Sequence, residues 1–130
     1  MKKTNSNELR TRLTPRVFNI NGKDVYAYDK VSVFDETAIG VNGAKYQIVS
    51  FPSGASVSAH FHTAVREVFL IESGKGEITI NGKAHIAAKG DIFLIQPKDS
   101  HALHNTGSAP FILHIFKWNE DPNDITWTQK

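Results

Sequence analysis

The chain contains no cysteine, and this absence removes two kinds of chemistry. Without thiols the protein can form neither disulfide bridges nor the thiolate ligands of zinc fingers and iron–sulfur clusters. Long apolar runs are missing as well, since none approaches the roughly 18 residues that a membrane-spanning helix requires. We therefore expect a protein without a membrane contact and without a cysteine-based metal site.

The chain also lacks a large excess of either positive or negative charge. The chain has 15 lysines and arginines against 13 acidic residues, a formal net charge of +2, and no basic stripe. This balance is too weak to indicate a nucleic-acid partner. The start at Met1 carries two lysines, but no apolar stretch follows, so a signal peptide is not indicated. We expect a cytoplasmic protein.

Residues that favour β-strands are abundant in the sequence. The 130 residues are enough for one domain, and eight phenylalanines accompany short runs rich in Val, Ile and Thr. Residues 1–15 are mostly polar without a helical period, which predicts a flexible or partner-bound arm before a single domain at 16–130. Asn21-Gly22 and Asn81-Gly82 are strong two-residue hairpin signals.

Short runs between turn signals predict a series of strands without helical periodicity. Clear examples lie at 44–51, 56–62, 66–73, 75–80, 83–88 and 91–97. This spacing is typical of an all-β sandwich or barrel. The runs at 68–71 and 92–95 are apolar on both faces, which indicates cover on both faces. A second sheet layer or a partner subunit would provide it, and we expect a homodimer for at least one face.

Histidine and glutamate stand at spacings that suit a metal ion. His60 and His62 lie two apart, so in a strand they share one face, while Glu67 lies five beyond His62. This odd separation requires the chain to turn near 63–64 before the carboxylate can join the imidazoles. A carboxylate among large apolar side chains needs a partner, and imidazole with carboxylate suits Fe, Mn, Ni, Co, Cu or Zn.

The string Gly54-x5-His60-x-His62-x4-Glu67-x6-Gly74 resembles the first motif of the cupin superfamily. A second motif of that family, G-x5-P-x-G-x2-H-x3-N, is matched downstream. Its glycine, histidine and asparagine are matched by Gly90, His101 and Asn105. The chain departs from it with Gln96 for the usual proline and Lys98 for the usual glycine. We expect Pro97, between these two, to keep the turn.

The resemblance implies an all-β fold, a double-layered antiparallel β-barrel with jelly-roll topology. It also implies that His60, His62, Glu67 and His101 ligate one divalent transition metal, such as Fe, Mn, Ni or Zn. From this we expect a metal-dependent enzyme for a small oxygen-rich substrate, with an iron-dependent dioxygenase as one form. A redox-neutral isomerase, cyclase or lyase, or a non-catalytic module that binds a small metabolite, remains open.

For other residues the sequence predicts only which way the side chain points or whether it is buried. Alternation places Gln47 and Phe51 on one face of their strand and Tyr46 on the other, without deciding which face is inside. The expected apolar pocket wall consists of Val65, Phe69 and Ile71, with Phe93 or Leu94. Among the remaining side chains, His104 and Arg66 should point away from the site and His114 should be a hydrogen-bonded core residue, while His85 is undetermined.

Overall fold

Eleven strands in two antiparallel sheets make up most of the protein, in a computed structural model that describes residues 1–128. The strands are β1 (Thr14–Ile20), β2 (Lys23–Phe34), β3 (Lys45–Phe51), β4 (Ser56–Phe61), β5 (Arg66–Ser73), β6 (Lys75–Ile80), β7 (Lys83–Ala88), β8 (Ile92–Ile95), β9 (His101–His104), β10 (Phe111–Trp118) and β11 (Thr126–Trp127). Three short helical segments accompany them: α1 (Ser6–Leu9), the 3₁₀ turn η1 (Arg10–Arg12) and α2 (Glu36–Ile39).

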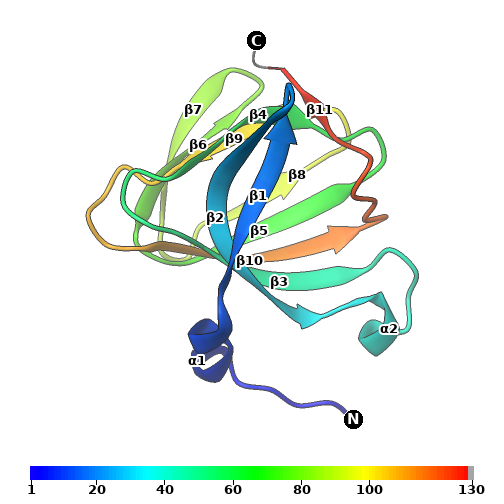
Figure 1. The fold of residues 1–130 in the computed structure, drawn as a ribbon. Coiled ribbons are helices and arrows are strands. Elements are labelled where there is room, and N and C mark those ends of the chain that lie inside the picture. Colours follow the sequence, from blue (N-terminus) through cyan, green and yellow to red (C-terminus); the bar gives the residue numbers. More distant parts are fainter. Residues whose placement is uncertain (129–130) are drawn as a thin grey trace.

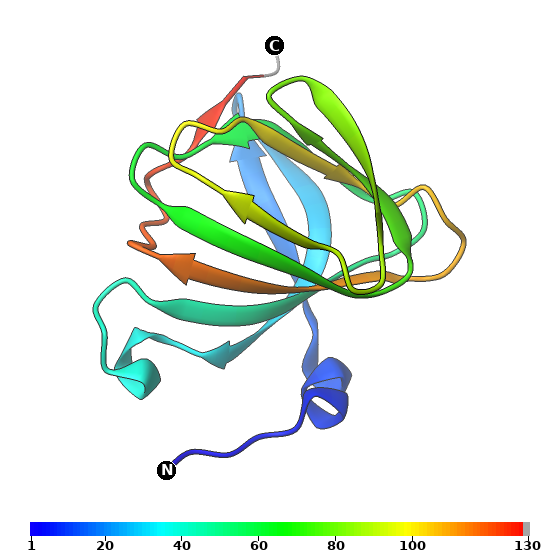
Figure 2. The same ribbon diagram turned by 180° about the vertical axis from the view of Figure 1, so that it is seen from behind.

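The two sheets face each other across one core. The six-stranded sheet has the order β1-β2-β3-β10-β5-β8, and the five-stranded sheet has the order β11-β4-β9-β6-β7 (Figure 1). Seen from behind, β8 and β5 of one sheet lie beside β7 and β6 of the other (Figure 2). No ladder joins the two sheets within residues 1–128, so they form a sandwich with jelly-roll character. The predicted all-β fold class is confirmed.

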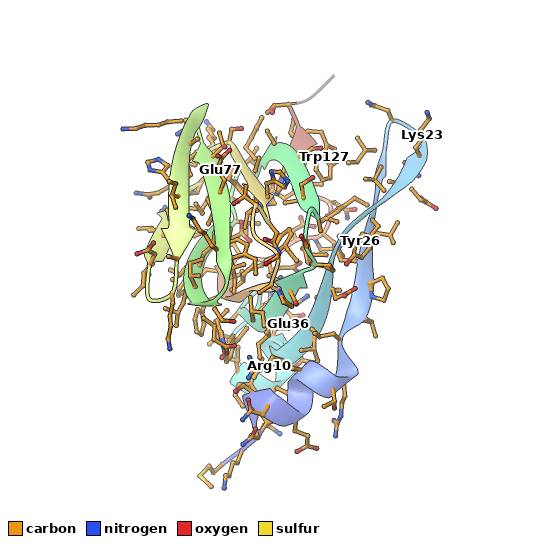
Figure 3. The ribbon with its side chains drawn as sticks, turned by 90° about the vertical axis from the view of Figure 1, so that its left-hand side faces the viewer. Arg10, Lys23, Tyr26, Glu36, Glu77 and Trp127 are labelled. Carbon is orange, nitrogen blue, oxygen red and sulfur yellow. The ribbon has the colours of Figure 1, made fainter. Side chains whose placement is uncertain are left out.

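Both predicted hairpins form at their Asn-Gly pairs. In the β1–β2 hairpin Asn21 and Gly22 have φ of 52° and 80°, and in the β6–β7 hairpin Asn81 and Gly82 have φ of 50° and 82°. Positive φ at both central positions is the type I′ geometry, which matches the right-handed twist of the flanking strands. Figure 3 shows Lys23 at the tip of the β1–β2 hairpin, on the far side of the molecule from Glu77 of β6.

Packing in the core accounts for one of the two apolar faces of β5 and β8. On β5, Phe69 and Ile71 are 1% exposed and point between the sheets. On the outer face Leu94 is 57% exposed and Ile92 is 68% exposed. Of the two alternatives expected in the pocket wall, Phe93 or Leu94, the structure excludes Leu94, because its register opposite Val68 turns it outward. The homodimer that would cover this outer face stays a prediction.

The N-terminal segment forms two consecutive helical turns against the six-stranded sheet. The Asn5 side chain accepts a hydrogen bond from the Asn7 amide at 2.9 Å, which caps α1, and Leu9 is buried. Arg10, labelled in Figure 3, pairs with Glu72 of β5. β1 begins at Thr14, two residues before the expected domain boundary, and the division into arm and domain stays a prediction. Within residues 1–128 no helix is long and apolar enough to cross a bilayer.

Candidate metal centre

Two strands of the five-stranded sheet bring the first pair of histidines together. His60 on β4 and His101 on β9 are direct partners in the antiparallel register. His62 follows just after β4, and the chain then bends at 63–64 before β5 begins, as the odd spacing required. Glu67 enters from β5 of the opposite sheet and is 3% exposed, on the same inward face as Phe69. The structure thus gathers all four residues of the predicted site.

Backbone carbonyl groups set the orientation of each imidazole. Nδ1 of His60 lies 2.8 Å from the carbonyl oxygen of Ser58, Nδ1 of His101 lies 2.9 Å from that of Asp99, and Nδ1 of His62 lies 2.6 Å from that of Asp124. Because a carbonyl oxygen can only accept, each Nδ1 must carry the proton and donate. In the neutral rings each Nε2 is then left with a free lone pair, the state that a metal ligand needs.

These lone pairs meet around one point. Ring nitrogens of His60, His62 and His101 lie within 4.8 Å of one another, so the three histidines could hold a metal ion. Oε2 of Glu67 lies 3.1 Å from Nε2 of His101 and 3.4 Å from Nε2 of His62. Neither approach has hydrogen-bond geometry, and Oε2 is buried without a partner among the described residues. Acceptors that face one another in this way fit a cation between them.

The pKa shifts of His60 and Glu67 agree with a cation between these groups, whereas the contact with Glu67 outweighs burial and raises the pKa of His62. Burial, followed by the neighbouring His101, lowers the pKa of His60 to about 3. Burial alone would raise the pKa of Glu67, but the contacts with His101 and His62 and the charge of Lys117 hold that pKa well below its usual range. A neutral imidazole and an ionised carboxylate at neutral pH are the forms that bind divalent metals.

Asp124 holds the bend between His62 and Glu67, a role that no sequence pattern indicated. Its carboxylate accepts hydrogen bonds from the Thr63 amide at 2.8 Å, the Thr63 hydroxyl at 2.7 Å and the Ala64 amide at 2.9 Å. These bonds, led by the one from the Thr63 amide, lower the pKa of Asp124 to about 2. A polar C-terminal segment offers no local pattern from which this role could be read.

The turn with the two departures from the second motif keeps its shape. The amide of Asp99 donates to the carbonyl oxygen of Gln96 at 3.0 Å, with Pro97 and Lys98 as the two central residues. Lys98 has a φ of 72°, a left-handed conformation that glycine adopts most easily. The Lys98 amide donates to the carbonyl oxygen of His62 at 2.6 Å, which ties this turn to the site.

A cavity of about 390 Å³ leads to the histidines. Gln47 and Phe51 line it, so the inward face of β3 is theirs, while Tyr46 points to the other side of the sheet. Phe69 contributes to the wall as expected. Val65 and Ile71 are buried but do not reach the cavity, and Phe93 packs against the core.

Two aromatic rings that no sequence motif indicated pack against His60. Trp127 on β11 has its ring centroid 4.9 Å from that of His60, and Phe18 on β1 lies 6.5 Å from it. Figure 3 shows Trp127 at the same end of the sandwich as the β1–β2 hairpin tip. Both rings place apolar surface against this proposed ligand.

The other histidines lie outside the site. His104 is exposed. His114 is half-buried on the outer face of the six-stranded sheet, where it contacts the Tyr46 hydroxyl and Glu72. Its expected hydrogen bonds are present, although it faces away from the main core. His85 is half-buried near Phe93, and Arg66 is exposed and donates to Gln96, as its alternation predicted.

Comparison with known sequences identifies a family and two curated relatives. A family model described as a cupin domain matches residues 47–116, more than half of the chain. An oxalate-binding protein of Thermotoga maritima is 33% identical over 61 residues, which cover 47% of this chain and 50% of the relative. An uncharacterized protein of Methanocaldococcus jannaschii is 32% identical over 59 residues, 45% of this chain and 47% of the relative. The chain spans about half the length of the curated relatives it matches.

Solved structures with the same fold cover more of the chain. An uncharacterized conserved protein with a double-stranded β-helix domain from Klebsiella pneumoniae superposes with a TM-score of 0.71 at 20% identity, over 100% of this chain and 99% of that one. A predicted oxalate decarboxylase from Thermotoga maritima gives 0.70 at 24% identity, over 83% and 94%. A sugar phosphate isomerase from Silicibacter pomeroyi gives 0.68 at 16% identity, over 80% and 67%. At these identities the likeness establishes the fold alone.

Proposed function

This chain belongs to the cupin superfamily, and we propose that it is a metal-dependent enzyme that acts on a small oxygen-rich substrate, a carbonyl, enediol or acid compound. Ring nitrogens of three histidines and a buried carboxylate oxygen without a hydrogen-bond partner among the described residues face one another beside a cavity. This arrangement is the main support for the proposal, because it combines a cation site with room for a small molecule.

A divalent Fe, Mn, Ni or Zn ion fits the donor set of His60, His62, Glu67 and His101. When bound, such an ion supplies Lewis acidity and, in the case of iron, redox chemistry with dioxygen. The carbonyl groups of Ser58, Asp99 and Asp124 hold the three rings in the ligating tautomer, so little rearrangement would accompany binding.

The protein's own side chains would position the substrate and exclude water. Phe69, Phe18 and Trp127 surround the histidines with apolar surface. Lys117 stands at the inner part of the cavity with Nζ 3.6 Å from Oε1 of Glu67. A lysine there can offer a proton or a positive charge to a substrate oxygen that lies against the carboxylate.

The names of relatives agree with the proposed substrate class, while the structural likeness by itself establishes only the fold. One matched relative is an oxalate-binding protein, and two structural neighbours are a predicted oxalate decarboxylase and a sugar phosphate isomerase. All three names concern small molecules rich in oxygen and negative charge. The identities are low, so these names support a class of substrate and not a particular compound.

Two reaction types fit the site. An iron-dependent dioxygenase would cleave a diketone or enediol compound with the metal as its main chemical group. A redox-neutral isomerase, cyclase or lyase needs a proton-transfer group as well, and Lys117 beside Glu67 is the observation that favours this second candidate.

Metal reconstitution separates these candidates. Metal-free protein would be loaded with Fe, Mn, Ni, Co or Zn and assayed for oxygen consumption with diketone and enediol compounds, and anaerobically for conversion of hydroxy acids and sugar phosphates. Oxygen uptake with iron alone would select the dioxygenase, and anaerobic turnover with several metals would select the redox-neutral enzyme. Tight binding of a compound without turnover under any condition would leave a binding module and contradict the proposed catalysis.

A further inference from the structure

Four basic side chains line the cavity that leads to the histidines. Arg16 comes from β1, Lys30 from β2, Lys45 from β3 and Lys117 from β10. Lys45 and Lys117 are direct partners in the β3–β10 register, and Lys117 is in turn opposite Glu67 on β5. The row of Lys45, Lys117 and Glu67 therefore crosses three adjacent strands on the inward face of the six-stranded sheet.

Ion pairs with carboxylates neutralise only part of the positive charge of these four basic side chains. Four carboxylates also line the cavity: Glu67, Glu120, Asp121 and Asp124. Across the described chain, the one ion pair within 4 Å that involves the four basic residues is Lys117–Glu67 at 3.6 Å. The carboxylates balance the basic groups in number, so a divalent ion on the histidines would leave the cavity with a net charge of about +2.

Three of these carboxylates are occupied or distant. The carboxylate of Asp124 is engaged by the amides of the 63–65 bend, and that of Glu67 faces the histidines. The charge of Glu120 acts to raise the pKa of Lys30 and Lys45, and that of Asp35 acts to raise the pKa of Lys45, but neither carboxylate makes an ion pair with these lysines within 4 Å. Asp121 makes no such pair either, so no carboxylate of residues 1–128 lies within 4 Å of the ammonium group of Lys30 or Lys45.

The closely placed positive charges of these lysines lower the stability of the folded state. Burial, followed by the charge of Lys45, lowers the pKa of Lys30, and burial, followed by the charge of Lys117, lowers the pKa of Lys45. Half-buried cations that repel one another reduce stability unless an anion joins them. Such an arrangement on the wall of a cavity is typical of a binding site and gives no advantage to folding.

We propose that Lys30, Lys45 and Lys117 bind a second anionic group of the substrate, a carboxylate or a phosphate, while the oxygens at its other end face the histidine cluster. This inference rests on the proposed function in one respect, which is that the histidine end holds the reacting part of the same molecule. Arg16 flanks the subsite, with its guanidinium carbon 3.9 Å from the Phe18 ring centroid and a hydrogen bond to the Val17 carbonyl oxygen. The substrate class is thereby narrowed to small dianions with a metal-chelating head.

Paired probes test the subsite directly. Isothermal titration of manganese-loaded protein would compare malonate with acetate and phosphoglycolate with glycolate, at one fixed ionic strength. We expect at least one dianion to bind about tenfold or more tightly than its partner, and the pair that shows the effect identifies carboxylate or phosphate. Lys45→Met and Lys30→Met should each remove most of this advantage. Lys23→Met, an exposed charge at the hairpin tip, is the matched control and should keep it.

Two results would overturn the subsite. Equal affinity for dianion and partner in the wild type is one, and a dianion advantage that survives in both lysine variants is the other. Melting temperature gives a second readout, since Lys45→Met and Lys30→Met remove a crowded charge and should melt at or above the wild-type temperature. Folded variants that melt clearly lower would contradict the repulsion from which the subsite is inferred.

Metal-free protein separates this inference from the proposed function. Binding of inorganic phosphate or malonate that depends on the lysines but not on any metal would support the subsite while the metal-dependent function fails. Binding that requires the metal and is unchanged by the lysine substitutions would support the metal-dependent function and contradict the subsite.

Discussion

The backbone carbonyl oxygen of Asp124 accepts a hydrogen bond from Nδ1 of His62 at 2.6 Å. The same residue's carboxylate binds the amides that follow His62, at Thr63 and Ala64, and so joins the C-terminal segment to the bend that precedes Glu67. One residue thus fixes the tautomer of a proposed ligand and the path of the chain toward the next ligand.

Replacement of Asp124 should loosen both proposed ligands without touching them. We expect Asp124→Ala to weaken metal binding by about 10–100-fold, because the bend at 63–65 loses its acceptor, and the segment whose Asp124 backbone carbonyl orients His62 loses its attachment to that bend. Competition against a chelator of known affinity would measure this loss. Asp24→Ala, on the exposed β1–β2 hairpin, is the control. An unchanged affinity in Asp124→Ala would show that the bend holds its shape without the carboxylate.

The stability that Asp124 provides should vanish in acid. Hydrogen bonds, first that from the Thr63 amide, lower its pKa from 3.8 to about 2. A carboxyl group with a lowered pKa stabilises the folded state above its unfolded pKa and loses that effect as pH falls through the folded value. In metal-free protein the difference in unfolding free energy between wild type and Asp124→Ala should be constant above about pH 5 and shrink from about pH 4 to pH 2. Urea titrations across this range would reveal it, and a difference that grows in acid would contradict it.

Lys98 occupies a turn position at some energetic cost. Its φ of 72° is costly for a side chain with a Cβ, so Lys98→Gly should raise the unfolding free energy by about 1 kcal/mol, after the greater freedom of glycine in the unfolded chain is subtracted. Thermal and urea unfolding would measure the change. Destabilisation would show that the lysine side chain contributes more than its backbone conformation costs.

Gly54 and Gly74, which bracket the first motif, should differ sharply in tolerance. Both have positive φ, 80° and 82°. A Cβ on Gly74 would lie 2.3 Å from the carbonyl oxygen of Pro110, whereas one on Gly54 would meet nothing within 4 Å. Gly74→Ala should therefore cost about 1–3 kcal/mol more than Gly54→Ala, in which only the backbone conformation is penalised. Similar losses in the two variants would mean that Pro110 moves away without difficulty.

Local chemistry explains why the fold could be predicted. The Asn-Gly hairpins, the strand at 66–73 and the bend demanded by the odd spacing from His62 to Glu67 depend on neighbours in the chain. The inward face of β3 could not be derived, because alternation defines two faces and tertiary packing chooses between them. The choice between Phe93 and Leu94 for the pocket wall was left open for the same reason.

The remainder of the site depends on contacts between distant residues. Asp124 lies 61 residues from Thr63, and Trp127 reaches His60 from the other end of the chain. Lys45 and Lys117 are unremarkable as single lysines and become a pair only through the β3–β10 register. Such relationships come from the topology of the sheets, which one sequence does not specify.

Metal content tests the central claim most directly. Elemental mass spectrometry would compare the wild type with His101→Ala and with His104→Ala, each expressed in medium that contains Fe, Mn, Ni, Co and Zn. His104 is an exposed neighbour on the same strand and serves as the matched control. We expect about one metal per chain in the wild type and in His104→Ala, and far less in His101→Ala. A folded wild type with almost no metal, or a His101→Ala protein with as much metal as the control, would contradict the metal site.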